Sequence, residues 1–218
     1  MGSFHVHVDR SVYARTLFVV DRPVYTAGMP NSETIPSSQS GARERILLTA
    51  HALFYRDGIR ATGIDRVIAE SEVSKVTFYR HFPSKNDLIQ AFLEYRHQRW
   101  MAWFQTALAR HGGTAQALVP TLAEWFEDEG FRGCAFINSV VELGGSQPAI
   151  VAISQRHKLE MTEVIRGLLP STGDQPTQIA QALALALDGA IVEAQLLQAP
   201  VAALASFRRI IVALGVDK

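Results

Sequence analysis

The sequence predicts an all-α protein of about nine helices, with an N-terminal three-helix unit followed by a helical bundle. From residue 42 onward, apolar residues recur every three or four positions, the spacing that places them on one face of a helix. Glycine and proline, often beside residues that cap helix ends, divide this part of the chain into segments. Strand-like alternation is confined to the first 40 residues, so a purely helical fold is expected.

The first helix is expected over residues 42–57. Gly58 follows it and suits the left-handed conformation that ends many helices. Thr62 is expected to cap a second, short helix near residues 63–70. The apolar faces of these two helices are formed by Ile46, Leu47, Ala50, Leu53 and Phe54, and by Ile64, Val67 and Ile68.

A tight turn separates the second helix from a third, near residues 74–81. Ser74 is a good N-cap for this helix, and Pro83 and Ser84 end it and begin the next one. Two short helices joined by a tight turn, with polar residues on the outer surface of the second, form a helix-turn-helix. The second helix of that motif fits the major groove of DNA. The aromatic residues assigned to the core of this unit are Phe78 and Phe82.

The rest of the chain is divided into longer helices by Gly and Pro. The breaks fall at Gly112-Gly113, Gly130–Gly133, Gly144-Gly145, Pro170 and Pro200. The expected helices cover residues 84–110, 114–129, 134–143, 148–169, 176–197 and 200–214.

Residues 1–40 are expected to be a disordered tail, because one or two isolated strand-like stretches do not fold alone. Residues 28–41 are rich in Gly, Pro and Ser and are typical of a linker. As an alternative, Met29 is the biological start and the upstream part is a mis-called reading frame.

Composition narrows the class of protein. The formal net charge of the chain is zero, but residues 41–100 hold ten Lys and Arg against seven Asp and Glu, and residues 101–218 hold eight against eleven. Positive charge is thus enriched where the helix-turn-helix lies. The most apolar tract, residues 179–197, contains charged and amide side chains, so it indicates a buried or interface helix and no membrane span. The single cysteine suits a reducing cytoplasm.

The run VSKVTFYRHFPSKNDLI at residues 73–89 resembles the TetR family of bacterial transcriptional regulators, and RGCAFINSVVEL at 132–143 resembles a segment in one branch of that family. The resemblance implies a homodimer with a DNA-binding domain, residues 41–86, and a ligand-binding and dimerisation domain, residues 87–218. It also implies a double-stranded palindromic operator that is released when a small-molecule effector binds.

The resemblance assigns DNA contacts within the helix-turn-helix. The residues expected at phosphates are Thr62, Lys75, Tyr79, His81 and Lys85. The candidates for base edges are Lys75, Val76, Thr77 and Arg80. Arg80 is the best reader, because arginine pairs bidentately with guanine. In the alternative interpretation, Tyr79 and His81 pack against the first helix and do not contact DNA.

Two residues depart from the usual pattern of the family. Glu72 stands in the helix-helix turn where the family usually has Gly, and a non-Gly residue at positive φ costs about 1 kcal/mol. Val76 occupies a position that is often Gly or Ala, where its methyl groups contact a thymine methyl or fill space. The operator sequence therefore stays open.

The C-terminal half is expected to hold the dimer interface and the effector pocket. The helices near residues 176–197 and 200–214 suit a four-helix dimer interface, or alternatively pack within one subunit. An aromatic-rich set favours a hydrophobic or aromatic ligand, although any single member is equally explained as core. The candidate lining residues are Trp100, Trp103, Phe104, Leu122, Trp125, Phe126, Phe136, Ile137, Asn138 and Val141. The polar candidates that would orient the ligand are Asn138, Glu142, His157 and Gln195.

An enzyme is not expected, because the sequence contains no metal-ligand spacing, phosphate-binding loop, dinucleotide fingerprint or catalytic constellation, and no cofactor is implied. Two alternatives to an effector-released repressor remain. One is a TetR-like regulator that is controlled by a protein partner or by oxidation of Cys134. The other is a helical ligand-binding protein with a degenerate DNA unit, for which Glu72 is the reason. The identity of the effector, the regulated genes and the choice between repressor and activator are not specified by the sequence.

Overall fold

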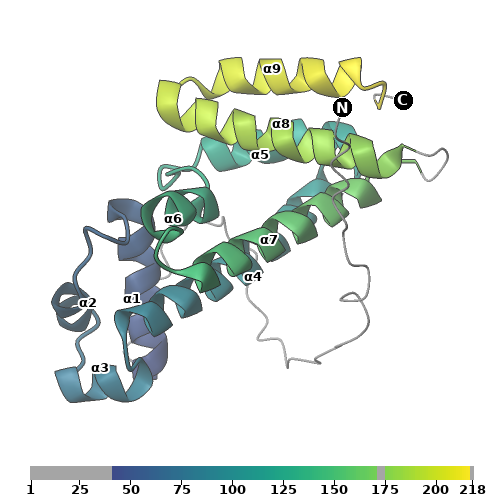
Figure 1. The fold of residues 1–218 in the computed structure, drawn as a ribbon. Coiled ribbons are helices and arrows are strands. Elements are labelled where there is room, and N and C mark those ends of the chain that lie inside the picture. The colour runs from purple at the N-terminus through teal and green to yellow at the C-terminus, as the bar shows by residue number, and fades with distance from the viewer. Residues whose placement is uncertain (1–40, 171–174, 217–218) are drawn as a thin grey trace, which may run out of the picture.

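The computed structural model describes residues 41–170 and 175–216. The expectations for residues 1–40 lie outside this described part. Within it, the chain forms nine α-helices, one short 3-10 helix and no strand, so the all-α prediction is confirmed (Figure 1). The helices are α1 (Ala42–Asp57), α2 (Ile64–Glu70), α3 (Lys75–His81), α4 (Lys85–Arg110), η2 (Ala115–Ala117), α5 (Leu118–Phe126), α6 (Ala135–Leu143), α7 (Pro148–Gly167), α8 (Pro176–Leu197) and α9 (Pro200–Ala213).

The three N-terminal helices form a small unit around a shared apolar core. α1 packs against α2, α3 and the first turns of α4. Phe54 of α1 meets Phe92 of α4 edge to face, with ring centroids 5.5 Å apart. Phe78 and Phe82 are buried, as the sequence predicts. Because these rings are enclosed, the polar residues of α3 are left on the outside of the unit.

α4 joins this unit to the rest of the molecule. Its N-cap Ser84 accepts a hydrogen bond from the amide of Asp87 at 3.2 Å, which fixes the start of the helix. At 1.5 Å per residue, its 26 residues span about 39 Å. α4 therefore runs from the helix-turn-helix into the C-terminal half, where it lies along α7 (Figure 1).

The helix expected over residues 114–129 is shorter and begins differently. The chain first forms the 3-10 turn η2, and α5 then covers only Leu118–Phe126. Pro120 explains the start, because it lacks the amide hydrogen that an interior helical position would donate and is tolerated only in a first turn. After Phe126, Asp128 turns the chain by accepting a hydrogen bond from the amide of Gly130 at 2.6 Å.

The last two helices form an antiparallel pair on the side of the molecule opposite α3 (Figure 1). α8 packs against α7 and α9, and α9 also covers α5. By length and composition alone, α8 is apolar enough to cross a membrane, but 39% of its most apolar window is buried in the protein. Asp188 in the middle of α8 forms an ion pair with Lys158 of α7. One face of α8 is therefore packed inside the helical bundle.

Candidate nucleic-acid interface and interior chamber

The third helix is held rigidly at its N-terminus and exposes its outer face. The hydroxyl of Ser74 accepts a hydrogen bond from the amide of Thr77 at 3.1 Å, which is the cap that the sequence predicts. Val76 is 78% exposed, although apolar, and Tyr79 is 40% exposed. Lys75 and Arg80 are also exposed. A cationic and apolar surface of this kind can meet phosphates and base edges together.

Two of the remaining α3 candidates are half-buried. The Thr77 hydroxyl lies 2.9 Å from that of Ser74, so it is occupied in the cap. His81 is half-buried at the end of the helix. Tyr79 packs edge to face on Phe78 at 5.2 Å and still presents much of its ring to solvent. The structure therefore brings six candidates together on α3, with the outermost surface formed by Lys75, Val76, Tyr79 and Arg80.

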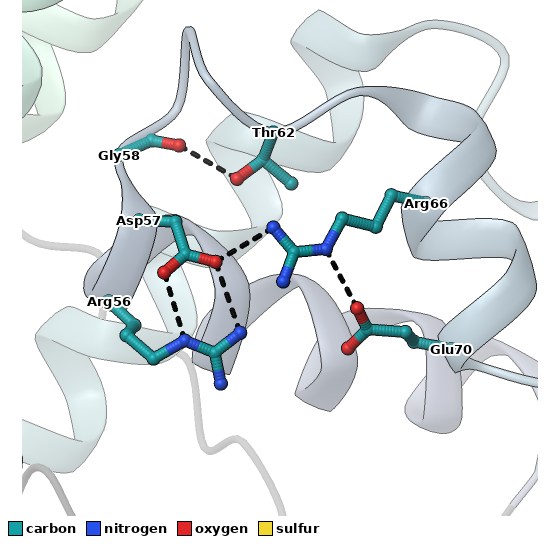
Figure 2. A network of polar contacts seen from close by, with 6 residues as sticks. All are labelled: Arg56, Asp57, Gly58, Thr62, Arg66 and Glu70. Atoms are coloured by element: carbon teal, nitrogen blue, oxygen red, sulfur yellow. Dashed lines mark hydrogen bonds and ion pairs between the residues drawn. The ribbon is translucent and has the colours of Figure 1, made fainter.

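The expectation that Thr62 caps α2 is wrong. Gly63, not Thr62, is the N-cap of α2. The side chain of Thr62 is fully buried, and its hydroxyl donates a 2.8 Å hydrogen bond to the carbonyl of Gly58 (Figure 2). This bond closes the loop between α1 and α2. Because the hydroxyl is enclosed by this loop, it offers no surface to a phosphate.

Lys85 is also turned away from the expected phosphate contact. Its ammonium group donates a 2.7 Å hydrogen bond to the carbonyl of Ile59 and lies 6.0 Å from the centre of the Phe54 ring. Burial lowers the pKa of Lys85, and the nearby Glu142 carboxylate opposes that shift. In this structure Lys85 ties the start of α4 to the loop between α1 and α2.

A polar network joins the end of α1 to α2 (Figure 2). The carboxylate of Asp57 receives Arg56 at 2.9 Å and Arg66 at 2.8 Å, and Arg66 also pairs with Glu70 at 2.8 Å. A hydrogen bond from Arg56 is the largest of the effects that lower the pKa of Asp57. These pairs are solvent-exposed and contribute little stability each, but they orient two cations of the DNA-binding unit.

The turn between α2 and α3 contains the strain that the sequence predicts. Glu72 adopts φ +53°, in the left-handed region, and is one of two non-glycine residues at positive φ in the described part of the chain. Its amide reaches the carbonyl of Ala69 at 3.3 Å, and its side chain is exposed. The helix-turn-helix geometry is therefore kept, at the energetic cost of a side chain where glycine is favoured.

The aromatic residues of the C-terminal half form a closely packed cluster. The Trp100 ring stacks on Phe104 at 4.5 Å and meets Trp125 edge to face at 5.5 Å. Phe136 of α6 stacks on His157 of α7 with centroids 3.7 Å apart. The members of the predicted set that are fully enclosed are Trp100, Trp103, Phe104, Leu122, Trp125, Phe126 and Phe136.

This cluster leaves only a small cavity, which we name the interior chamber. It measures about 10 Å³ and is lined by Arg96, Trp100, Trp125, Cys134, Ala135, Phe136, His157, Lys158, Met161 and Ile191. Of the predicted set, only Trp100, Trp125 and Phe136 line it. The other four buried members belong to the surrounding core and do not line the chamber: Trp103, Phe104, Leu122 and Phe126.

The far end of α6 does not reach the chamber. Val141 is 82% exposed and lies on the outer face of the helix, away from the chamber, so its assignment to a ligand pocket stays a prediction. Ile137 and Asn138 are half-buried, and the amide of Asn138 donates to the carbonyl of Arg132 at 3.0 Å. Asn138 and Val141 instead line a second site, and Ile137 lines neither.

The second site is an outer cleft of about 380 Å³ between the end of α1 and α6, lined in part by Asn138, Val141, Glu142 and Gln195. Glu142 bridges this cleft, because its carboxylate accepts hydrogen bonds from the amides of Ile59 at 3.3 Å and Arg60 at 2.8 Å. Tyr55 forms a second bridge by donating to the carbonyl of Gly133 at 2.9 Å. Both bridges connect the helix-turn-helix to the C-terminal half.

The sequence interpretation missed the charged lining of the chamber. Arg96 is fully buried, and its guanidinium lies 4.0 Å from the centre of the Tyr55 ring. Lys158 pairs with Asp188, and the buried Cys134 lines the chamber beside it. The signal for Arg96 was its position one helical turn before Trp100, on the same face of α4.

A histidine pair lies beside the chamber. The Nδ1 atoms of His97 and His157 are 3.1 Å apart, and Nε2 of His97 lies 3.2 Å from Glu160. Burial lowers the pKa of both histidines, and for His157 the positive charges of Lys158 and other neighbours lower it further. The pair is thus held neutral, with one ring donating to the other. In the described ranges, no group of three or more metal-ligating side chains gathers here or elsewhere.

Comparison with known proteins links this architecture to one family. The family model for bacterial regulatory proteins of the tetR family matches residues 46–92. Two curated relatives are HTH-type transcriptional regulators: YerO of Bacillus subtilis is 42% identical over 53 residues, and a Lactococcus lactis protein is 24% identical over 106 residues. These matches span 24% and 46% of the chain, and only 18% and 54% of the relatives' own lengths.

Solved structures extend the similarity over about four fifths of the chain. A TetR-family transcriptional regulator from Streptomyces coelicolor is 30% identical, with a TM-score of 0.71 over 81% of this chain and 96% of its own. A TetR regulator from Chloroflexus aurantiacus, 23% identical with a TM-score of 0.63, covers 80% of this chain and 94% of its own and supports the fold alone. The proteins similar to this chain are named as regulators of transcription and not as enzymes. The chain belongs to the TetR family.

Proposed function

We propose that this protein is a DNA-binding transcriptional repressor that acts in the cytoplasm and is released from a palindromic operator by a small effector. The observation that carries the proposal is the exposed face of α3. There, Lys75, Val76, Tyr79 and Arg80 project from a helix whose opposite face is fixed by the buried Phe78. Such a helix can enter the major groove, with Arg80 directed at a guanine and Lys75 at a phosphate.

Two copies of α3 are needed to read a palindrome, and the outer face of α8 and α9 supports a dimer. Large apolar side chains are exposed on both helices, and exposed apolar side chains of this size are typical of a protein interface. Its members are Leu185, Leu196, Leu197, Val201, Ile210 and Val212. Pairing these faces forms a four-helix interface and fixes the separation of the two recognition helices, which must be about 34–36 Å.

The effector signal is proposed to travel through α4 and the bridges across the outer cleft. α4 contributes Trp100 to the interior chamber and Phe92 to the contact with α1. A shift of this helix therefore moves the helix-turn-helix. The bonds from Glu142 and Tyr55 would change with it, because both span the same gap. A small change in the separation of the α3 helices then lowers operator affinity.

The test is fluorescence anisotropy with labelled DNA from immediately upstream of the chain's own gene. Specific binding that competes poorly with unrelated DNA, and that a hydrophobic compound reverses, is the expected result. Binding that no compound in a thermal-shift screen reverses would remove the effector. A complete absence of specific binding would overturn the regulatory function in favour of a ligand-binding protein with a degenerate DNA unit.

The dimer has its own test. Leu185→Glu places a carboxylate in the proposed interface and is expected to yield a monomer in sedimentation velocity, with loss of operator binding. Leu159→Glu is the matched control, because Leu159 is a 55% exposed leucine on α7, outside the α8–α9 face. A wild-type monomer at micromolar concentration would contradict the dimer.

A further inference from the structure

Two tryptophans that line the interior chamber each carry a buried hydrogen-bond donor that has no acceptor among the described residues. Trp100 and Trp125 are 3% and 2% exposed, and both line the chamber. Within the described ranges, neither buried indole Nε1–H has a hydrogen-bond acceptor. Buried indole N–H groups normally have one. Two donors at one site therefore suit a ligand that brings an acceptor oxygen.

The charges around the chamber point to the sign of that ligand. Arg96 is fully buried, so its guanidinium acts in a medium that screens charge poorly. Lys158 also lines the chamber, and its ammonium group pairs with Asp188. The positive charges of Lys158 and Arg96 also help to lower the pKa of His157, after the larger effect of burial. The chamber is thus electropositive, a setting that favours an anion and disfavours a cation.

We propose that the interior chamber binds an aromatic carboxylate, whose oxygens accept hydrogen bonds from Arg96 and the indoles of Trp100 and Trp125 while its ring lies among the aromatic side chains. The binding site itself does not depend on the proposed function. Only the role of this ligand as the effector rests on it. The aromatic ring is required because most of the lining consists of ring faces and apolar side chains.

The ligand needs more room than about 10 Å³, and the fold offers a way to provide it. Phe136 stacks on His157, so a ligand ring can replace the phenyl group on that face. Ala135 lines both the chamber and the outer cleft, which makes the segment at residues 132–135 the wall between them. Gly133 in that wall has φ +77° and carries the bridge to Tyr55. Opening the wall admits the ligand and loosens that bridge in one movement.

The test compares two probes of the same shape, 2-naphthoate and 2-naphthamide, by calorimetry on the full chain. Wild-type protein is expected to bind the carboxylate at least ten-fold more tightly than the neutral amide. Arg96→Met should abolish that preference, and Arg96→Lys should keep part of it. If Arg96→Met does not fold, as judged by circular dichroism, the lysine variant and the tryptophan variants below decide.

Trp100→Phe and Trp125→Phe remove one donor each and are expected to weaken 2-naphthoate binding several-fold, with little effect on 2-naphthamide. Trp103→Phe is the matched control, because Trp103 lies in the same cluster but does not line the chamber. Equal effects of all three substitutions would overturn the role of the indole donors.

The outcomes separate this assignment from the proposed function. Equal affinity for both probes, or binding of neither, overturns the carboxylate site. If the neutral amide binds equally well and releases operator DNA, the proposed effector-released repressor still stands. Preferential binding of 2-naphthoate with the expected variant pattern supports the site. If such binding does not release operator DNA in the anisotropy assay, the site stands and the effector role falls.

Discussion

The outer face of α3 and the interior chamber differ in the exposure of their polar side chains. On α3, Arg80 and Lys75 point into solvent, and packing is left to Phe78 beneath them. In the chamber, Arg96 and His157 are enclosed by rings. Burial of charge costs stability unless partners are present, whereas exposed charge costs almost nothing. The α3 surface can therefore change its sequence preference freely, while the chamber is constrained by the fold around it.

The largest expected effect tests the exposed side of this comparison. Arg80→Ala removes the side chain proposed to read a base, which is worth about 1–3 kcal/mol per half-site, or roughly twice that for a dimer on a palindrome. Operator affinity should fall accordingly in anisotropy titrations, with the unfolding midpoint unchanged because Arg80 is exposed. Arg166→Ala on α7 is the control. Loss of stability in place of affinity would place Arg80 in the fold instead of the interface.

The buried side of the comparison is tested by pH. Burial lowers the pKa of His51 and of His157 well below the ordinary value. Both rings are therefore neutral when folded and take up protons when unfolded, so the free energy of unfolding is greatest above about pH 6.5 and falls as the pH drops toward the folded pKa values. Each histidine contributes a slope of up to about 1.4 kcal/mol per pH unit in that window. Urea unfolding between pH 7.5 and 5.5 measures it.

His51→Phe separates the contribution of His51 to the pH dependence of the free energy of unfolding. The ring of His51, on α1, lies edge to face with Phe92 and Tyr95 of α4, and its Nε2 has no hydrogen-bond partner among the described residues. Phenylalanine should fit there, reduce the acid sensitivity and leave that of His157 in place. An unchanged slope in this variant would mean that His51 is already protonated in the folded protein.

A smaller effect distinguishes two lysines that the sequence treats alike. Lys75 is exposed on α3, whereas Lys85 donates to the carbonyl of Ile59. Lys75→Ala is therefore expected to flatten the dependence of log affinity on log salt by about 1 for each phosphate that the lysine neutralises. Lys85→Ala should leave that dependence unchanged and lower stability, because it removes a bond between α4 and the α1–α2 loop. A flattened slope for Lys85→Ala would restore its phosphate role.

These two lysines show where prediction from sequence succeeds and where it ends. The caps at Ser74 and Ser84 are predictable because their partners lie three residues away along the chain. Lys85 is not, because its partner, Ile59, lies 26 residues away and only the folded loop brings it near. The prediction for Thr62 is wrong for a local reason: its hydroxyl can either cap α2 or donate back to Gly58, and it donates.

The chamber is harder to predict than the helix-turn-helix. Hydrophobicity places Trp100, Trp125 and Phe136 inside, and they do meet there. Nothing in periodicity separates such rings from Trp103, which is equally buried but lies outside the lining. Arg96 escapes prediction because arginine is almost never fully buried, so a sequence interpretation assigns it to the surface. A site that depends on a fully buried charged side chain is recognised only once the fold is known.

The Glu72 side chain is exposed, yet its backbone is held in a strained left-handed conformation. It therefore gives the smallest expected effect on the exposed side of the comparison. Glu72→Gly relieves the left-handed conformation at φ +53° and should stabilise the protein by about 1 kcal/mol, somewhat less after the added chain entropy of glycine in the unfolded state. Glu72→Gln keeps the strain and removes only the charge. If both variants bind operator DNA more tightly but only the glycine variant is more stable, the carboxylate acts on DNA and the backbone acts on the fold. Equal stability of the two variants would show that the turn holds residue 72 at positive φ without cost.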